Sequence, residues 1–208
     1  MRPFIHVNCA MSADGKIAGS DRRQVRISSE EDKQRVKNLR RKYDAILVGV
    51  GTVLADDPHL TVKGLSYDEN PIRIVLDPHG RTPHEALVVD GSAPTIIITD
   101  DFCEKTWDNA EALRCGDPLE LGKAMEMLAQ KGIENILVEG GGETIASFFR
   151  NRMVDTYTVF VGSMIIGGRI SPTPVDGDGW ITEGGVKLEL KGSEVLGNGV
   201  LLTYRPIF

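Results

Sequence analysis

Short apolar runs, bounded by turn residues, recur along most of the chain. They are rich in valine and isoleucine and too short for helices, so they predict buried strands. Glycine, proline, aspartate and asparagine cluster between them and mark turns, as in Asp14-Gly15. The predicted strands cover residues 4–10, 45–49, 72–77, 86–89, 95–99, 136–139 and 154–162.

Other stretches have the period of a helix. Apolar side chains recur at helical spacing within residues 118–130, and Gly132 follows as a natural end. Ser28 and Glu31 have the spacing of a capping box, which predicts a helix from there to about Tyr43. A short helical turn is also predicted to follow the strand at 45–49, and Pro58 stops it.

The C-terminal tail changes period. Apolar and polar residues alternate near 186–190 and again near 200–204, on either side of Gly197-Asn198-Gly199, a hairpin-type turn. Strands alternating with helices, followed by a hairpin, predict one α/β domain over residues 1–208. Its sheet is expected to be mostly parallel, with an antiparallel C-terminal ribbon.

Composition narrows the class of protein. The formal net charge of −6 argues against a nucleic-acid binder. No run approaches the roughly 18 apolar residues of a membrane span, and the N-terminus does not resemble a signal peptide. The three cysteines, without a CxxC spacing, are expected to be reduced and mostly buried. We therefore expect a cytoplasmic protein that does not bind membranes.

Two predicted strands run into glycine-rich corners that open helices, at Gly49–Thr52 and at Gly140–Thr144. Open α/β sheets bind ligands at the carboxyl ends of their strands, and a helix N-terminus favours an anion. Neither corner has the lysine of a Walker A loop, and neither has the third glycine of a dinucleotide fingerprint. Tight turns alone explain a single corner about as well. Two corners, each followed by a threonine, favour a nucleotide-like ligand.

Several charged residues lie near these corners. Glu139 ends the strand before the second corner, where it either contacts a ligand or caps a backbone N–H. Asp56-Asp57 is a carboxylate pair in a cleft or a polar helix end. Arg40 and Lys63 either bind a phosphate or belong to a solvated face. The four histidines have no metal-binding spacing, so no metal is expected.

Four segments taken together resemble the reductase family of riboflavin biosynthesis. They are SADGKIA, DAILVGVGTVLADDPHLTV, PIRIVLDPHGRTP and ILVEGGGETIASFF with the following MVDTYTVFVGSMIIGG. The resemblance is closest to the stand-alone form, which acts on 2,5-diamino-6-ribosylamino-4(3H)-pyrimidinone 5′-phosphate. The bacterial relatives fuse this module to a zinc deaminase, whose H-x-E and P-C-x-x-C signatures do not occur here. The resemblance implies a three-layer dihydrofolate-reductase-like fold, NADPH as cofactor and a homodimer.

The resemblance also implies roles for residues. Thr52 and Asp56 match positions that contact the nicotinamide cofactor, and Glu139 matches one that contacts the substrate. Arg40, Leu60 and Lys63 match substrate-binding positions, where Lys63 replaces an arginine and loses its planar fork. The pyrophosphate-binding loop matches Gly140, Gly141, Gly142, Glu143, Thr144, Ile145 and Ala146.

Two departures leave questions open. Gln24 and Arg26 stand at ligand-contacting positions of a loop that differs from the fused enzyme. Asp100-Asp101 follow a strand near the expected 2′-phosphate of the adenosine, which they would disfavour, so NADH stays an alternative to NADPH.

The implied reaction is hydride transfer to C1′ of the substrate ribose, with Glu139 orienting the ribose or favouring an iminium. Two other functions fit the same residues. One is reduction of a different pteridine or pyrimidine, and the other is a nucleotide-binding regulator without catalysis.

Overall fold

The computed structural model describes all residues, 1–208, and their contacts fall into two compact units. Unit 1 comprises Met1–Phe4 and Leu39–Val138, and unit 2 comprises Ile5–Asn38 and Glu139–Phe208. Each unit is therefore built from two separate stretches of the chain. That the whole chain behaves as one domain stays a prediction.

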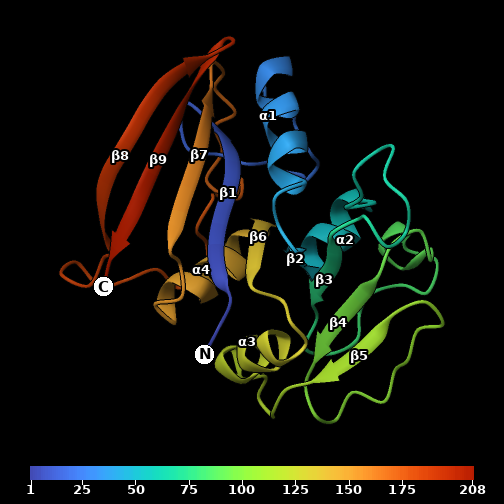
Figure 1. Cartoon of the computed structure of the whole chain (residues 1–208). Coiled ribbons are helices and arrows are strands. Elements are labelled where there is room, and N and C mark those ends of the chain that lie inside the picture. Colours follow the sequence, from blue (N-terminus) through green and yellow to red (C-terminus); the bar gives the residue numbers. More distant parts are fainter. The chain divides into compact units, whose positions relative to one another are not determined.

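Unit 1 contains a row of parallel strands (Figure 1). Their order is β5 (Glu111–Arg114), β4 (Thr95–Thr99), β3 (Ile72–Leu76) and β2 (Ala45–Gly49), with the start of β6 (Asn135–Gly140) beside β2. Every residue of β2 and β4 is buried, as expected for parallel strands covered on both faces. The short β5 strand is polar at both ends, and the apolar pattern did not predict it.

The helices of unit 1 follow its strands. α2 (Val50–Asp56) comes directly after β2, and α3 (Leu121–Gln130) turns its leucines and Met125 into the core. Gly132 follows the α3 C-cap with φ of +86°, as predicted for a helix-ending glycine. The strand predicted at 86–89 is wrong, because Leu87–Val89 form a single turn of 3₁₀-helix, η1. Apolar runs this short do not distinguish the two structures.

A buried arginine lies within the unit 1 core. Arg73 on β3 is fully inaccessible, and it donates to Asp90 at 2.9 Å, Thr95 at 2.9 Å and the Ala93 carbonyl at 2.7 Å. A buried guanidinium is stable only when its charge is paired and its donors are used. Arg73 therefore ties the ends of β3 and β4 to the loop around Asp90.

Unit 2 combines parallel and antiparallel pairing. β1 (Phe4–Ser12) pairs parallel to β7 (Thr156–Gly162), from His6 opposite Thr156 to Ser12 opposite Gly162. β7 pairs antiparallel to β9 (Gly199–Ile207), which forms a long hairpin with β8 (Lys187–Leu196), drawn in red in Figure 1. The predicted C-terminal ribbon is confirmed. No helix of the protein has the length and apolarity that crossing a membrane requires.

Helix α1 (Glu30–Arg40) is shorter than predicted and has a different cap. Ser29, not Ser28, accepts the N–H of Asp32 at 3.1 Å, so the predicted Ser28–Glu31 capping box is wrong. Asp32 is buried and accepts from Arg35 Nε at 2.8 Å. The acidic first turn of α1 also suits the positive end of the helix dipole.

Candidate functional site

The first glycine corner lies in unit 1, where β2 meets α2. Gly49 is the N-cap residue of α2, and no side chain caps this helix. Thr52 is half-buried and Asp56 is exposed. They stand four residues apart and therefore share one face of α2. This face presents the hydroxyl and carboxylate that were predicted to contact a nicotinamide cofactor.

The carboxylate pair at the end of α2 is divided between two tasks. Asp57 adopts a left-handed conformation with φ of +41° and accepts the Leu87 N–H at 2.8 Å. It therefore ties the end of α2 to the start of η1. Although Asp56 is exposed, neighbouring protein groups desolvate part of its carboxylate and raise its pKa above that of an ordinary aspartate. Asp56 is therefore the member of the pair whose environment fits a ligand contact.

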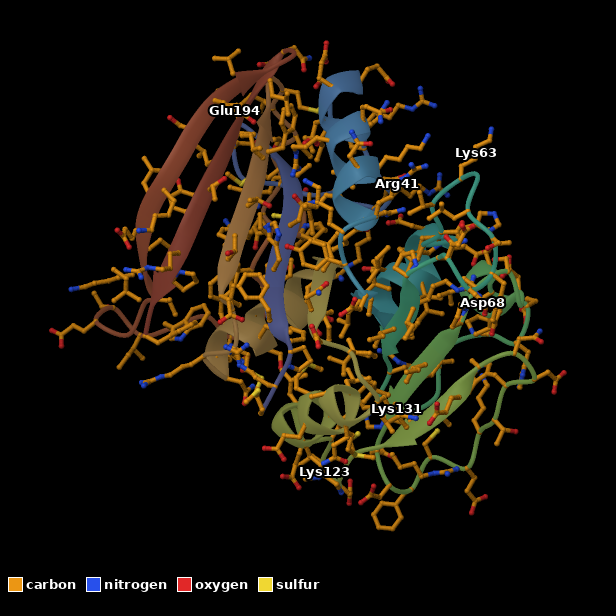
Figure 2. The ribbon with its side chains drawn as sticks, in the orientation of Figure 1. Arg41, Lys63, Asp68, Lys123, Lys131 and Glu194 are labelled. Carbon is orange, nitrogen blue, oxygen red and sulfur yellow. The ribbon has the colours of Figure 1, made fainter.

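The predicted substrate contacts of unit 1 differ in exposure. Leu60 has φ of +52° and only 3% of its surface is exposed, because its side chain joins the core cluster around Val50 and Val53. Its backbone is the part that remains for a ligand. Lys63 is exposed and extends from the tip of its loop (Figure 2). Arg40 is half-buried at the last residue of α1.

The strand that carries Glu139 is held at its start by a reciprocal clamp in unit 1. Asp44 accepts the N–H groups of Glu134 and Asn135 at 2.8 and 3.1 Å. Asn135 in turn accepts the Asp44 N–H at 2.9 Å. This clamp fixes β6 beside β2, and Glu139 follows as a half-buried residue near the end of β6.

The second glycine corner lies in unit 2, where α4 (Gly142–Arg150) begins. Gly141, the N-cap, has φ of +85°, which a glycine adopts without strain. No side chain caps α4, so a cap does not use its first N–H groups, and the helix dipole at this end favours an anion. Gly140, Gly142 and Thr144 are buried, and Glu143 is exposed. Ile145 and Ala146 pack in the core and offer only their backbone to a ligand.

Gly142 has a second reason to be glycine. A Cβ atom there would lie 2.5 Å from the Thr173 carbonyl oxygen and 2.8 Å from Asp176 Oδ2. The Asp176 N–H donates to the Gly142 carbonyl at 3.1 Å. The loop that follows β7 therefore packs directly on the first turn of α4, and sequence reasoning had assigned it no role.

A single aspartate anchors the start of this loop. Asp14 accepts the N–H groups of Ile166 and Gly167 at 3.1 and 2.7 Å and the Ser12 hydroxyl at 2.6 Å. The Ser12 hydrogen bond, followed by the backbone donors, lowers the pKa of Asp14 to about 2. Lys16 adds a bond from Nζ to the Ser171 carbonyl at 3.1 Å. The paired Gly167-Gly168 and the SADGK turn were the available sequence signals.

Asp100 and Asp101, which the sequence placed near the expected adenosine 2′-phosphate, have interaction partners within unit 1. Asp100 is buried and lies 2.9 Å from His79 Nδ1, and it accepts the Phe102 N–H. Asp101 accepts the Gly116 N–H at 2.9 Å and lies 4.0 Å from Lys123 Nζ. Both carboxylates therefore have cationic or N–H partners, which weakens the argument that they repel a phosphate. In unit 2, Gln24 and Arg26 are exposed.

The cysteines are free and buried, as predicted, and burial raises the pKa of the Cys9 and Cys115 thiols to about 11. No group of three or more histidine, cysteine, aspartate or glutamate residues is arranged to hold a metal ion.

Comparison with known proteins decides the family. The model of the RibD C-terminal domain matches residues 3–202. The chain belongs to the RibD C-terminal domain family. It is 38% identical over 220 residues to the 2,5-diamino-6-ribosylamino-4(3H)-pyrimidinone 5′-phosphate reductase of Archaeoglobus fulgidus, covering 99% of both chains. It is 40% identical over 214 residues to the reductase of the same name from Methanothermobacter thermautotrophicus, covering 98% of both.

A solved structure supports the same family. The deaminase/reductase of Thermotoga maritima superposes with a TM-score of 0.84 at 26% identity, over 99% of this chain and 57% of that longer chain. The dihydrofolate-reductase-like α/β fold implied by the resemblance to the reductases of riboflavin biosynthesis is confirmed. The chain is a reductase of riboflavin biosynthesis by family.

Proposed function

We propose that this chain reduces 2,5-diamino-6-ribosylamino-4(3H)-pyrimidinone 5′-phosphate to the corresponding ribitylamino compound. The observation that carries the proposal is near full-length identity of 38–40% to two reductases of that name. The proposal is further supported by the uncapped N-termini of α2 and α4, which carry the residues that match the cofactor-binding positions of the family. We propose NADPH as the cofactor and keep NADH as the alternative.

Each unit, taken by itself, carries residues that the resemblance assigns to a nicotinamide cofactor. In unit 2, the uncapped α4 N-terminus and the backbone of residues 140–146 suit a pyrophosphate, because they combine N–H donors with the helix dipole. In unit 1, Thr52 and Asp56 offer a hydroxyl and a carboxylate to the nicotinamide end. The cofactor, when bound, supplies the hydride.

The chain's own contribution is orientation and electrostatics. We propose that Glu139 binds the ribose and favours the open-chain iminium over the closed ring, because a carboxylate stabilises nearby positive charge. The ring opens as O4′ takes a proton, and C1′ becomes doubly bonded to nitrogen. Hydride addition at C1′ then returns an electron pair to that nitrogen. The proton taken up by O4′ is the only one that the balance requires, and we assign it to solvent water.

Substrate binding is assigned to Arg40, Lys63 and the Leu60 backbone. The exposed Lys63 ammonium suits the 5′-phosphate as a point charge, and Arg40 adds a second cation from the end of α1. Gln24 and Arg26 are proposed as secondary ligand contacts.

We propose that the protein is a cytoplasmic homodimer. The β8–β9 ribbon supports this, since Leu190 and Val195 are 56% and 82% exposed on a strand. β8 is the edge strand of its sheet, and a long edge strand with exposed apolar residues can pair with another chain. Sedimentation of a Leu190→Lys, Val195→Lys variant is expected to show a monomer where the wild type is a dimer. A wild type that sediments as a monomer removes the assignment.

The activity is tested by incubating the purified protein and NADPH or NADH with the ribotide in one assay and with dihydrofolate in another. Oxidation of cofactor with the ribotide alone is the expected result. Turnover of dihydrofolate instead would identify a different reductase. Cofactor binding without any turnover would indicate a regulator.

A further inference from the structure

The loop between α2 and β3 in unit 1 is exposed at its tip and held by buried polar groups at its base. Lys63 lies at the tip and extends away from the loop, while Asp68 lies farther along it (Figure 2). Gly64, next to Lys63, has φ of +93°, and no atom lies within 4 Å of where its Cβ would be. The tip is therefore open to a ligand.

Asn70 closes the base of this loop. Its side chain is buried, and Oδ1 accepts the Val62 N–H at 2.7 Å. Its Nδ2 donates to the carbonyls of Leu65 and Ser66 at 3.2 and 2.8 Å. The amide thus uses an acceptor and two donors at once, which neither aspartate nor leucine can reproduce. Val62, whose N–H donates to Asn70, directly precedes Lys63.

Arg73 holds the other side of the same segment. From its fully buried position, Nη1 donates to the His59 carbonyl at 3.4 Å and to the Leu87 carbonyl at 3.1 Å. The segment from His59 to Val62 is therefore fixed at both ends. Leu60 between them keeps a positive φ, a conformation that persists only when its surroundings impose it.

The buried contacts of Asn70 and Arg73 hold this loop more firmly than a surface loop that only joins α2 to β3 requires. Burying an amide is unfavourable unless every polar atom is paired, and most surface loops avoid it. Here the buried amide fixes the backbone on both sides of an exposed lysine, at Val62 on one side and at Leu65 and Ser66 on the other. A flexible lysine gains binding specificity when its backbone is held in place.

We infer that Asn70 is a positioning residue for the 5′-phosphate of the substrate and acts through Lys63. This rests on the proposed function, in which Lys63 binds that phosphate. Arg73 supports the same segment, but its removal leaves Asp90 without its buried partner and disturbs the core. Asn70 is therefore the residue to change.

The test compares Asn70→Ala, Lys63→Ala and the double variant, with Asn109→Ala, at an exposed asparagine of unit 1, as the control. Asn109 also donates to a backbone carbonyl of unit 1, that of Val89, but lies outside the loop. Each single variant at 70 or 63 is expected to raise KM for the ribotide about tenfold, with kcat and KM for NADPH little changed. The double variant is expected to match Lys63→Ala alone, since both act on one contact.

A second substrate separates positioning from general stability. With the dephosphorylated ribonucleoside, Asn70→Ala and the wild type are expected to have the same kcat/KM. Equal losses on both substrates, or additive effects in the double variant, would overturn the inference in favour of a purely structural role. Should Asn70→Ala not fold, Asn70→Ser serves instead, because it removes the amide donors without burying a charge beside the Leu65 and Ser66 carbonyls.

The outcomes also distinguish this inference from the function on which it rests. An active wild type with an unchanged KM in Lys63→Ala removes the role of Lys63 and this inference, but leaves the reductase. A wild type that does not reduce the ribotide removes the proposed function and the inference together.

Discussion

The carbonyl oxygen of Thr173 lies 2.5 Å from the position that a Cβ atom on Gly142 would occupy. The third glycine of the EGGGET corner is therefore required by the loop packed on α4, whatever ligand binds there. Gly141 is required for a different reason, its positive φ. The corner thus combines a conformational need, a packing need and an uncapped helix N-terminus.

This relationship predicts opposite effects for two similar substitutions. Gly142→Ala is expected to lower the free energy of unfolding by about 1–3 kcal/mol, because a backbone carbonyl cannot yield easily. Gly51→Ala, in α2, meets nothing within 4 Å and is expected to raise it by about 0.5–1 kcal/mol through helix propensity. Urea unfolding of both variants measures the difference. Equal destabilisation by both would show that the packing account of Gly142 is incorrect.

The stabilisation that Asp14 gives to the loop after β7 is expected to depend on pH. Hydrogen bonds hold the pKa of Asp14 at about 2, below the ordinary aspartate value of 3.8. A depressed carboxyl pKa stabilises the native state above the unfolded value, and the contribution is lost as pH falls through the folded value. The stability difference between wild type and Asp14→Asn should therefore be constant above about pH 4 and shrink toward pH 2. Urea midpoints across this range test it, and a difference independent of pH contradicts it.

The sequence predicted the parts of the fold whose patterns are local. Continuous apolar runs predicted β2, β4 and β7, and the alternating tail predicted the β8–β9 hairpin. It did not predict β5, which is polar at both ends, or the 3₁₀ turn at Leu87–Val89. These depend on neighbours that are distant in sequence, which no local pattern contains.

The same limit applies to the site. Glycines and carboxylates at strand ends marked both corners, because strand–helix junctions have a local signature. Asp14 and Asn70 act through side-chain hydrogen bonds to backbone groups of loops, and Asp176 donates its own N–H to the Gly142 carbonyl of α4. Such backbone partners are invisible in a sequence. The buried side chain of Leu60 was likewise hidden, since its position follows from the fold of its loop.

Asp56 is expected to make cofactor binding sensitive to pH. Partial desolvation raises the pKa of this exposed carboxyl, so it is protonated at a higher pH than an ordinary aspartate. If its carboxylate holds the nicotinamide end, KM for the cofactor should rise as pH falls through that raised pKa. Asp56→Asn should raise this KM about tenfold and remove the pH dependence. The same pH profile in variant and wild type would exclude Asp56 as its source.

Glu139 is expected to act on turnover. Glu139→Gln keeps the size of the side chain and removes its charge, so iminium stabilisation is lost while the fold is retained. We expect kcat to fall by about 100-fold or more, with the dissociation constant of NADPH changed by less than about threefold. Stopped-flow turnover and fluorescence titration measure the two quantities. Unchanged turnover would remove Glu139 from the reaction.

The central claim is that hydride passes from a reduced nicotinamide to C1′ of the ribotide. The most direct measurement uses NADPH deuterated at C4, in each of the two stereospecific forms, and reads the product by NMR and mass spectrometry. We predict that one form yields a ribitylamino product with one deuterium at C1′ and that the other yields none. Product without deuterium from either form, or no product at all, would contradict the account.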